Sequence, residues 1–201
     1  MFRPNRRLRT ATQQFLAAAK DPEWADGWPD ISIHLRGGDK QLDGQSRQAQ
    51  TTAGPEDYLA EAARWARHRH SACGSAERTK VFVATDSKEA VTIVRGWAAK
   101  HAGMLTVHMQ TDSVTQSITE TVASHRMQSA GLHVEGDAKY QAALEVMRDT
   151  HLMSRATVFI GMVMSQLGRI AVSVGTTNGR MQRAIAMVRR PLPTGELRPC
   201  A

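Results

Sequence analysis

The chain has 201 residues, a length that suits one domain, or one domain with a small appendage. Hydrophobic residues make up 41% of it, enough for a buried core, and no stretch is long and apolar enough to span a bilayer. The net charge of +7 favours an anionic partner, such as a phosphate ligand or nucleic acid. Because the arginines are scattered, we interpret this charge as a solvated surface rather than a nucleic-acid-binding stripe.

The predicted elements alternate between helices and strands. In chain order they are a helix over residues 5–20, a strand over 30–35, a helix over 55–68, a strand over 80–85, a helix over 87–101, a strand over 104–108, a helix over 139–154, a strand over 157–160, a helix over 165–173 and a strand over 184–188. This alternation predicts an α/β fold with a Rossmann-like parallel sheet and helices on both faces. We expect a single domain over residues 1–201, with a leading helix in 1–22, a mobile loop over 41–54 and a tail over 190–201.

Local signals support several of these elements. Gly37 and Gly38 end the first strand, and Pro55 opens the helix that follows the polar loop. Asp86 with Glu89 fits a capping box at the start of the next helix. Residues 110–137 lack a clear period, so we interpret them as a loop with some helix. One face of the helix over residues 139–154 carries Tyr140, Leu144, Met147 and His151.

The residues just past each strand are the candidates for function, because ligands of open parallel sheets bind at the carboxyl ends of the strands. The Gly-x-Gly-x-x-Gly fingerprint of dinucleotide binders is absent. After the first strand, however, His34 and Arg36 lead into two glycines, followed by Asp39 and Lys40. Two cations beside a glycine turn suit a diphosphate. The alternative is a surface turn with an Asp39–Arg36 ion pair, and the spacing does not decide between the two.

Two further segments place polar residues at the start of a helix. Asp86 follows the second strand, where it serves either an anion site or, more simply, a helix cap. Ser165 and Gln166 follow the buried strand over residues 157–160, and a hydroxyl beside the free N–H groups of a helix suits a phosphate.

Taken in order, these motifs resemble those of the α-1,6-fucosyltransferases and the Nod-factor fucosyltransferases. The resemblance covers nearly the whole chain, and it rests on His34-x-Arg36-x-x-Asp39-Lys40, on Val81-x-Val83-Ala84-Thr85-Asp86, and on Asp149-x-His151-x-x-Ser154-Arg155-Ala156 followed by Ser165-Gln166-x-x-Arg169. It implies the C-terminal, donor-binding half of a GT-B glycosyltransferase. Such an enzyme transfers fucose from GDP-fucose to a glycan hydroxyl with inversion, typically without a metal or other cofactor.

The resemblance also implies roles for individual residues. Arg36 and Lys40 match basic residues at the donor diphosphate, with Asp39 preserved between them, and Ser165 and Gln166 match residues that also hold phosphate. The guanosine would be contacted by His34 and Asp149. The matching family role of Asp86 is structural or supports the donor side.

Two departures from the family pattern leave two functions open. The family has a second arginine where this chain has Gly37, and its proposed catalytic base aligns with Gly44, so Asp43 becomes the candidate base beside Arg36. The chain is therefore either a fucosyltransferase donor domain or a truncated or degenerate nucleotide-sugar-binding module. The acceptor-side, N-terminal domain of the family is not represented in these residues. The compartment stays open, because eukaryotic relatives glycosylate proteins in the Golgi lumen and bacterial relatives work in the cytoplasm.

Overall fold

The fold is built on one parallel sheet. The computed structural model of the protein describes residues 5–18, 24, 27–35, 53–111, 136–162 and 165–186. Within these ranges five strands pair in the order β3-β2-β1-β4-β5, all parallel. The strands are β1 (Ile31–Leu35), β2 (Thr79–Thr85), β3 (Leu105–Met109), β4 (Val158–Gly161) and β5 (Arg183–Ala186).

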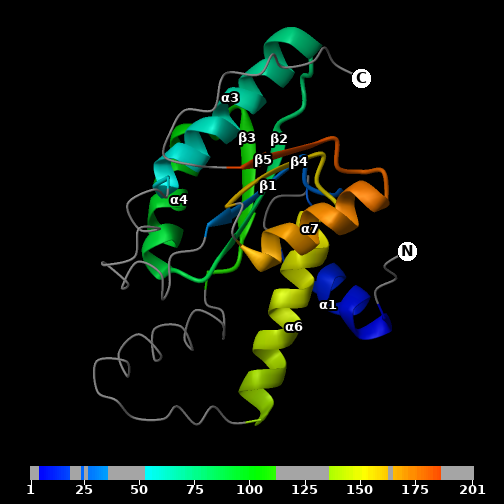
Figure 1. Cartoon of the computed structure of the whole chain (residues 1–201). Coiled ribbons are helices and arrows are strands. Elements are labelled where there is room, and N and C mark those ends of the chain that lie inside the picture. Colours follow the sequence, from blue (N-terminus) through cyan, green and yellow to red (C-terminus); the bar gives the residue numbers. More distant parts are fainter. Residues whose placement is uncertain are drawn as a thin grey trace.

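Helices cover both faces of this sheet. They are α1 (Arg6–Ala17), α3 (Pro55–Cys73), α4 (Lys88–Lys100), α6 (Gly136–Met153) and α7 (Gln166–Thr177). Figure 1 shows α3 and α4 on one side of the sheet, and α1, α6 and α7 on the other. The predicted α/β class, with a Rossmann-like sheet between two helical layers, is confirmed.

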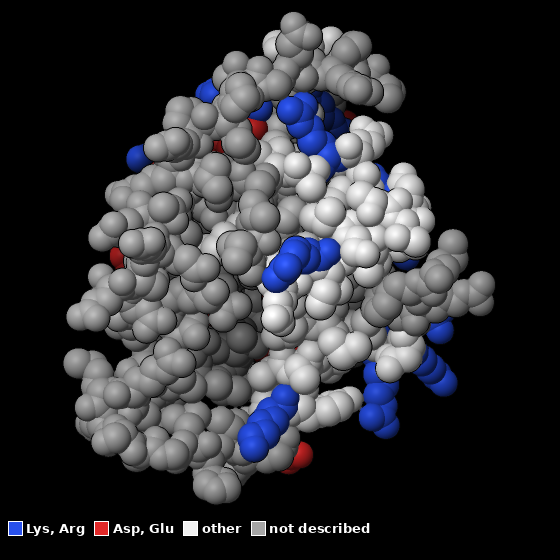
Figure 2. Space-filling view, in the orientation of Figure 1, with Lys and Arg blue, Asp and Glu red and all other residues white. Residues whose placement is uncertain are grey.

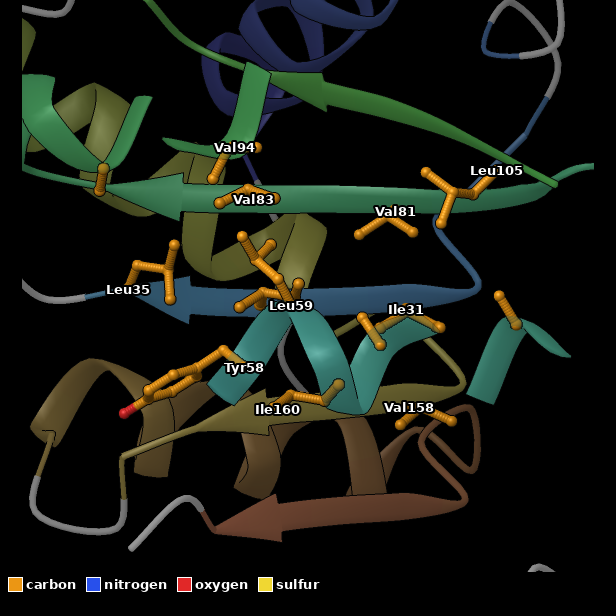
Figure 3. Packing of buried hydrophobic residues seen from close by; sticks show 14 residues of the cluster. Ile31, Leu35, Tyr58, Leu59, Val81, Val83, Val94, Leu105, Val158 and Ile160 are labelled. Atoms are coloured by element: carbon orange, nitrogen blue, oxygen red, sulfur yellow. The ribbon is translucent and has the colours of Figure 1, made fainter. Parts of the chain in front are cut away.

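Alternate residues of the strands build the core between the sheet and α3. Ile33 lies level with Val83 of β2 and Ile160 of β4, and all three point to the same face. Figure 3 shows Val83 and Ile160 of this face with Tyr58 and Leu59 of α3, which belong to the same cluster. Because the opposite face is also covered, β1, β2 and β4 are buried on both sides, and Val81 to Ala84 of β2 form a continuous apolar run.

The residues between these positions build a second core on the other face. Phe82 and Ala84 of β2 and Phe159 of β4 lie there. Their partners come from all three helices of that layer and from the connections: Leu16, Trp24, Leu152, Met153, Ala171 and Met181. Trp24 is buried, and its Nε1–H donates to the hydroxyl of Thr106 across 3.1 Å.

Two helices run further than the sequence predicted. Helix α3 continues past residue 68 to Cys73, where Gly74 adopts a left-handed conformation with φ of 62°. Helix α7 continues past residue 173 to Thr177, and Gly179 follows with φ of 68°. A glycine in this conformation is a common helix terminator, so both ends are set by a residue that needs no Cβ.

The predicted apolar face of α6 is buried only at its C-terminal end. His151 is 4% exposed, but Tyr140 and Met147 are 48% and 46% exposed. Only the last turns of α6 pack against the sheet, and the first turns extend beyond it (Figure 1). The buried residues of these last turns include Arg148, which the apolar pattern did not indicate.

Several sequence-based expectations fall outside the described residues. They concern the loop over residues 41–54, apart from Ala53 and Gly54, the segment over residues 112–135, and the tail over residues 190–201. The domain boundaries accordingly stay a prediction.

Candidate functional site

The strand order places the candidate site at a change of direction in the sheet. From β1 the chain continues through α3 to β2 on one side, whereas from β4 it continues through α7 to β5 on the other. β1 and β4 are neighbours, with Ile33 level with Ile160. In parallel α/β sheets, ligands bind outside the carboxyl ends of the two strands at such a switch point. The carboxyl ends of β1 and β4 therefore lie at the same edge of the sheet.

On the β1 side, His34 is the described candidate. It lies in the strand opposite Ala84 and is 7% exposed. Side chains alternate along a strand, so His34 points to the face that Ser32 shares, which is the face covered by α6. Arg36, Asp39, Lys40 and the candidate base Asp43 follow β1 in the sequence but lie outside the described residues.

On the β4 side, Ser165 and Gln166 begin helix α7. Ser165 is the N-cap, 2% exposed, and its hydroxyl accepts a hydrogen bond from the N–H of Gly168 across 3.3 Å. Gln166, the first helical residue, is exposed. No acidic residue occupies the first turn of α7. This helix end therefore presents backbone N–H groups and a partial positive charge to any anion at the edge of the sheet.

Two glycines allow the start of α7 to pack closely against β4. A Cβ on Gly161 would lie 2.3 Å from the ring of Phe159, and a Cβ on Gly168 would lie 3.1 Å from it. The phenyl ring therefore fills the space that side chains at these positions would need. The close approach fixes the position of the Ser165 cap relative to the end of β4.

The placement of Asp86 corrects one sequence-based reading. The N-cap of α4 is Ser87, whose hydroxyl accepts from the N–H of Ala90 across 3.2 Å, so the expected capping box of Asp86 with Glu89 is wrong. A serine directly before the first helical residue satisfies the helix end one position later. Asp86 itself is half-buried and follows β2 at the carboxyl edge, next to the end of β1.

Asp149 approaches from α6, on the same face of the sheet as His34. Its Oδ1 accepts two hydrogen bonds from Arg148, one from Nε at 2.9 Å and one from Nη2 at 2.6 Å. Burial raises the pKa of the Asp149 carboxyl to about 6, while the Arg148 guanidinium acts to lower it. The carboxylate is the charged form at neutral pH, and it can accept hydrogen bonds from a nucleobase.

Sequence reasoning missed the cluster around Arg148. The guanidinium lies over the ring of Phe15, 4.1 Å from the ring centroid, and it also donates to Gln110, which follows β3. The sequence held one signal, an arginine next to the predicted guanosine-binding aspartate. The partners of Arg148 lie on other elements, so the spacing of residues alone could not identify them.

The described residues show no metal cluster, and the basic side chains are not gathered into one patch on the face drawn in Figure 2. No group of three or more His, Cys, Asp or Glu side chains that could hold a metal occurs among them. On the face seen in Figure 2, their Lys and Arg side chains stand at several separate places. None of the helices in this part of the chain is long and apolar enough to cross a membrane.

The fold is similar to that of part of the solved protein POFUT1. No protein-family model matches the sequence, and no curated protein matches it. POFUT1 in complex with GDP is similar with a TM-score of 0.51 and 14% identity, over 92% of this chain and 47% of that chain. POFUT1 with GDP-fucose gives a TM-score of 0.46 and 14% identity, over 92% and 47%. The NodZ α-1,6-fucosyltransferase soaked with GDP-fucose gives a TM-score of 0.40 and 16% identity, over 83% and 41%.

The chain thus spans about half the length of these solved structures. At this identity, the similarity to POFUT1 establishes a shared fold. The Rossmann-like sheet of this chain therefore has the same architecture as about half of POFUT1, which was solved with GDP bound.

Proposed function

We propose that this chain is the donor-binding part of a fucosyltransferase-like glycosyltransferase, and that it binds GDP-fucose at the carboxyl edge of the sheet between β1 and β4. The observation that carries the proposal is the pairing of β1 with β4. This pairing brings the carboxyl ends of β1 and β4 to one edge, and it supports a site in which Arg36 and Lys40 would act together with the start of α7 at Ser165 and Gln166.

The proposed site matches a nucleoside diphosphate in charge. Arg36 and Lys40 supply two cations, and the N-terminus of α7 supplies backbone N–H groups, so the diphosphate is neutralised without a metal. Asp86, at the end of β2, and Asp39 line the donor side in this arrangement. Transfer of fucose to a glycan hydroxyl with inversion would then use Asp43 as the base, with Arg36 stabilising the leaving diphosphate.

Guanine is the base that the proposed site suits best. Its N1–H and N2–H groups donate, and a carboxylate accepts; Asp149 provides that carboxylate on the face to which His34 points. Uracil offers a single N–H donor flanked by carbonyl oxygens, so it pairs less well with an anionic acceptor. GDP should accordingly bind more tightly than UDP.

Calorimetry with GDP and UDP on two variants tests the proposal. Arg36→Ala should lower the affinity for both nucleotides, because both carry the diphosphate. Asp149→Asn places an amide donor opposite the donors of guanine. It should lower the affinity for GDP by about 10- to 100-fold and leave the affinity for UDP almost unchanged. Circular dichroism of both variants controls for folding. Equal affinity of the wild-type chain for GDP and UDP would remove guanine recognition from the proposal.

A further inference from the structure

We propose that Arg148 is a positioning residue for base recognition: it fixes the Asp149 carboxylate in the orientation that reads guanine. This inference rests on the proposed function, because it assigns a device to the guanine recognition that Asp149 would perform. The evidence is a connected set of contacts that begins at the carboxylate and reaches three elements of the fold.

The first contact is the pair itself. Arg148 is 7% exposed, and both of its hydrogen bonds to Asp149 fall on the same oxygen, Oδ1. A planar guanidinium that holds one carboxylate oxygen through two N–H groups restricts the rotation of the carboxylate. Within the described part of the chain, Oδ2 of Asp149 accepts no hydrogen bond, and the Asp149 side chain is 19% exposed. Oδ2 is therefore the oxygen left to accept from a ligand.

Arg148 is itself held in place by contacts beyond its own helix. Its guanidinium lies over the ring of Phe15 in α1, and its Nη2 also donates to Oε1 of Gln110, directly after β3. The amide of Gln110 in turn donates to Glu145 of α6 across 3.0 Å. An exposed ion pair between sequence neighbours would leave both side chains mobile, whereas these contacts fix the arginine from α1, the end of β3 and α6.

The aromatic ring under Arg148 is anchored as well. Phe15 meets Phe82 of β2 edge-on, with ring centroids 6.0 Å apart, and it lies 4.3 Å from the ring of His108 in β3. The Nε2–H of His108 donates to the carbonyl of Phe15 across 3.0 Å. Burial, together with the nearby Arg148 charge, lowers the pKa of His108, which favours its neutral form in this contact.

Arg148 also determines the charge of Asp149. Burial and Glu145 raise the pKa of the Asp149 carboxyl, and Arg148 is the group that opposes them. Among the other elements packed around the pair, β3 contributes His108, β1 contributes His34 on the same face of the sheet, and α1 contributes the uncharged Phe15. Without the guanidinium, Asp149 would become protonated at a higher pH. A protonated Asp149 is a poorer acceptor for the donors of guanine.

The test compares wild type with Arg148→Met and Arg148→Lys, using GDP and UDP as probes in calorimetry between pH 5 and 8.5. UDP serves as the internal control, because its diphosphate titrates in the same way as that of GDP. For wild type we expect a GDP preference that declines as the pH falls through about 6. Arg148→Met should lower the GDP-to-UDP affinity ratio at pH 7 by about tenfold or more, and it should move the midpoint of the decline to higher pH. Arg148→Lys restores the positive charge, so the pH midpoint of the decline should return most of the way to its wild-type value. The GDP-to-UDP affinity ratio should recover to a smaller extent.

The possible outcomes separate the inference from the proposed function. If wild type prefers GDP and Arg148→Met changes neither the ratio nor the midpoint, the positioning role is wrong and the proposed function stands. An equal loss of affinity for GDP and UDP, with an unchanged midpoint, would show a merely structural role and would also overturn the inference. If wild type itself does not distinguish the nucleotides, both the function and the inference fail.

A second variant covers the case in which Arg148→Met does not fold. Gln110→Ala removes one contact of Arg148 and leaves the Arg148–Asp149 pair intact. Like Arg148→Met, it should lower the GDP-to-UDP affinity ratio, by about threefold, and it should move the pH midpoint of the decline less. An unchanged ratio in this folded variant would contradict the positioning role.

Discussion

The hydroxyl of Ser32 donates a hydrogen bond across 3.2 Å to the carbonyl of Met153, and so ties the first strand to the last turn of α6. His34 follows Ser32 on the same face of β1, and Asp149 precedes Met153 by one helical turn. The bond therefore sets the height of Asp149 along the sheet relative to His34. If these two residues share the guanosine, a contact inside the core controls the geometry of the site.

Ser32→Ala tests this relationship. The variant removes one buried hydrogen bond and should lower the free energy of unfolding by about 1 kcal/mol in urea denaturation. It should also reduce the preference for GDP over UDP, because α6 is less firmly held at the level of Asp149. Ser71→Ala, which removes an exposed hydroxyl contact within α3, is the matched control. A preference that stays at the wild-type value in Ser32→Ala would show that this bond does not set the site.

Ser165→Ala tests the anion-binding end of α7. Loss of the cap should lower the free energy of unfolding by about 1 kcal/mol. It should also lower the affinities for GDP and UDP equally, because both present a diphosphate. Asn5→Ala removes the corresponding cap of α1, where the side chain accepts from the N–H of Leu8, so it should cost similar stability without changing nucleotide affinity. Equal nucleotide affinity in the two variants would exclude the start of α7 from the site.

The order of the elements could be predicted from the sequence because short segments rich in apolar residues alternate with helical patterns. The run at Val81, Phe82 and Val83 is an example, since both of its faces are buried. The adjacency of β1 and β4 could not be predicted in this way, because strands far apart in sequence pair through the tertiary fold. The sequence named the segments after both strands as candidates, but only the sheet order shows that β1 and β4 end at the same edge.

The position of Arg148 illustrates the same limit for the site. Periodicity placed Tyr140 and Met147 on the apolar face of α6, yet both are exposed and Arg148 is buried. The arginine is tolerated there because Asp149, Gln110 and Phe15 satisfy its charge and its donors. Helical spacing carries no information about Phe15, which reaches α6 from another helix.

Gly175→Ala should destabilise the protein even though alanine is the better helix former. A Cβ at this position would lie 2.9 Å from the backbone carbonyl oxygen of Ser154 and 2.9 Å from Cβ of Met181. Because the carbonyl belongs to the backbone, α7 has to move away from the end of α6, at a cost of about 1–3 kcal/mol. Gly96→Ala in α4 is the control: its Cβ would meet nothing within 4 Å, so it should gain up to about 1 kcal/mol. Thermal unfolding of the two variants should shift in opposite directions, and parallel shifts would contradict the packing at Gly175.

His151 should make the protein less stable in mild acid. Burial, with a smaller effect from Arg155, lowers the pKa of His151 to about 4, below its ordinary value of 6.5. As the pH falls from 6.5 to 4, the unfolded chain takes up a proton that the folded chain does not. This difference removes about 3 kcal/mol of stability. His151→Leu lacks the effect, so the difference in unfolding free energy between wild type and variant should grow over this range.

Comparing the two proteins at each pH removes the opposing contribution of Asp149. Its raised pKa acts in the other direction, because the folded state binds a proton before the unfolded state does as the pH falls from about 6. Asp149 is present in both proteins, so its contribution cancels in the difference. A difference that is constant between pH 6.5 and 4 would contradict a depressed pKa of His151.

Residues 1–201 expressed alone should bind GDP without transferring fucose. Transfer requires the anomeric carbon of the donor and the acceptor hydroxyl to be held in line, and such positioning supplies a large part of the rate. The chain spans 47% of POFUT1, and we expect the remaining half of such a protein to supply the acceptor side. A well-placed base typically adds about 10²- to 10⁴-fold, and Asp43 is one position from where the family resemblance places it. Incubation with GDP-fucose and glycan acceptors should therefore give no product above background, while calorimetry detects GDP. Clear transfer by these residues would show that they suffice, and loss of that transfer in Asp43→Asn would then identify the base.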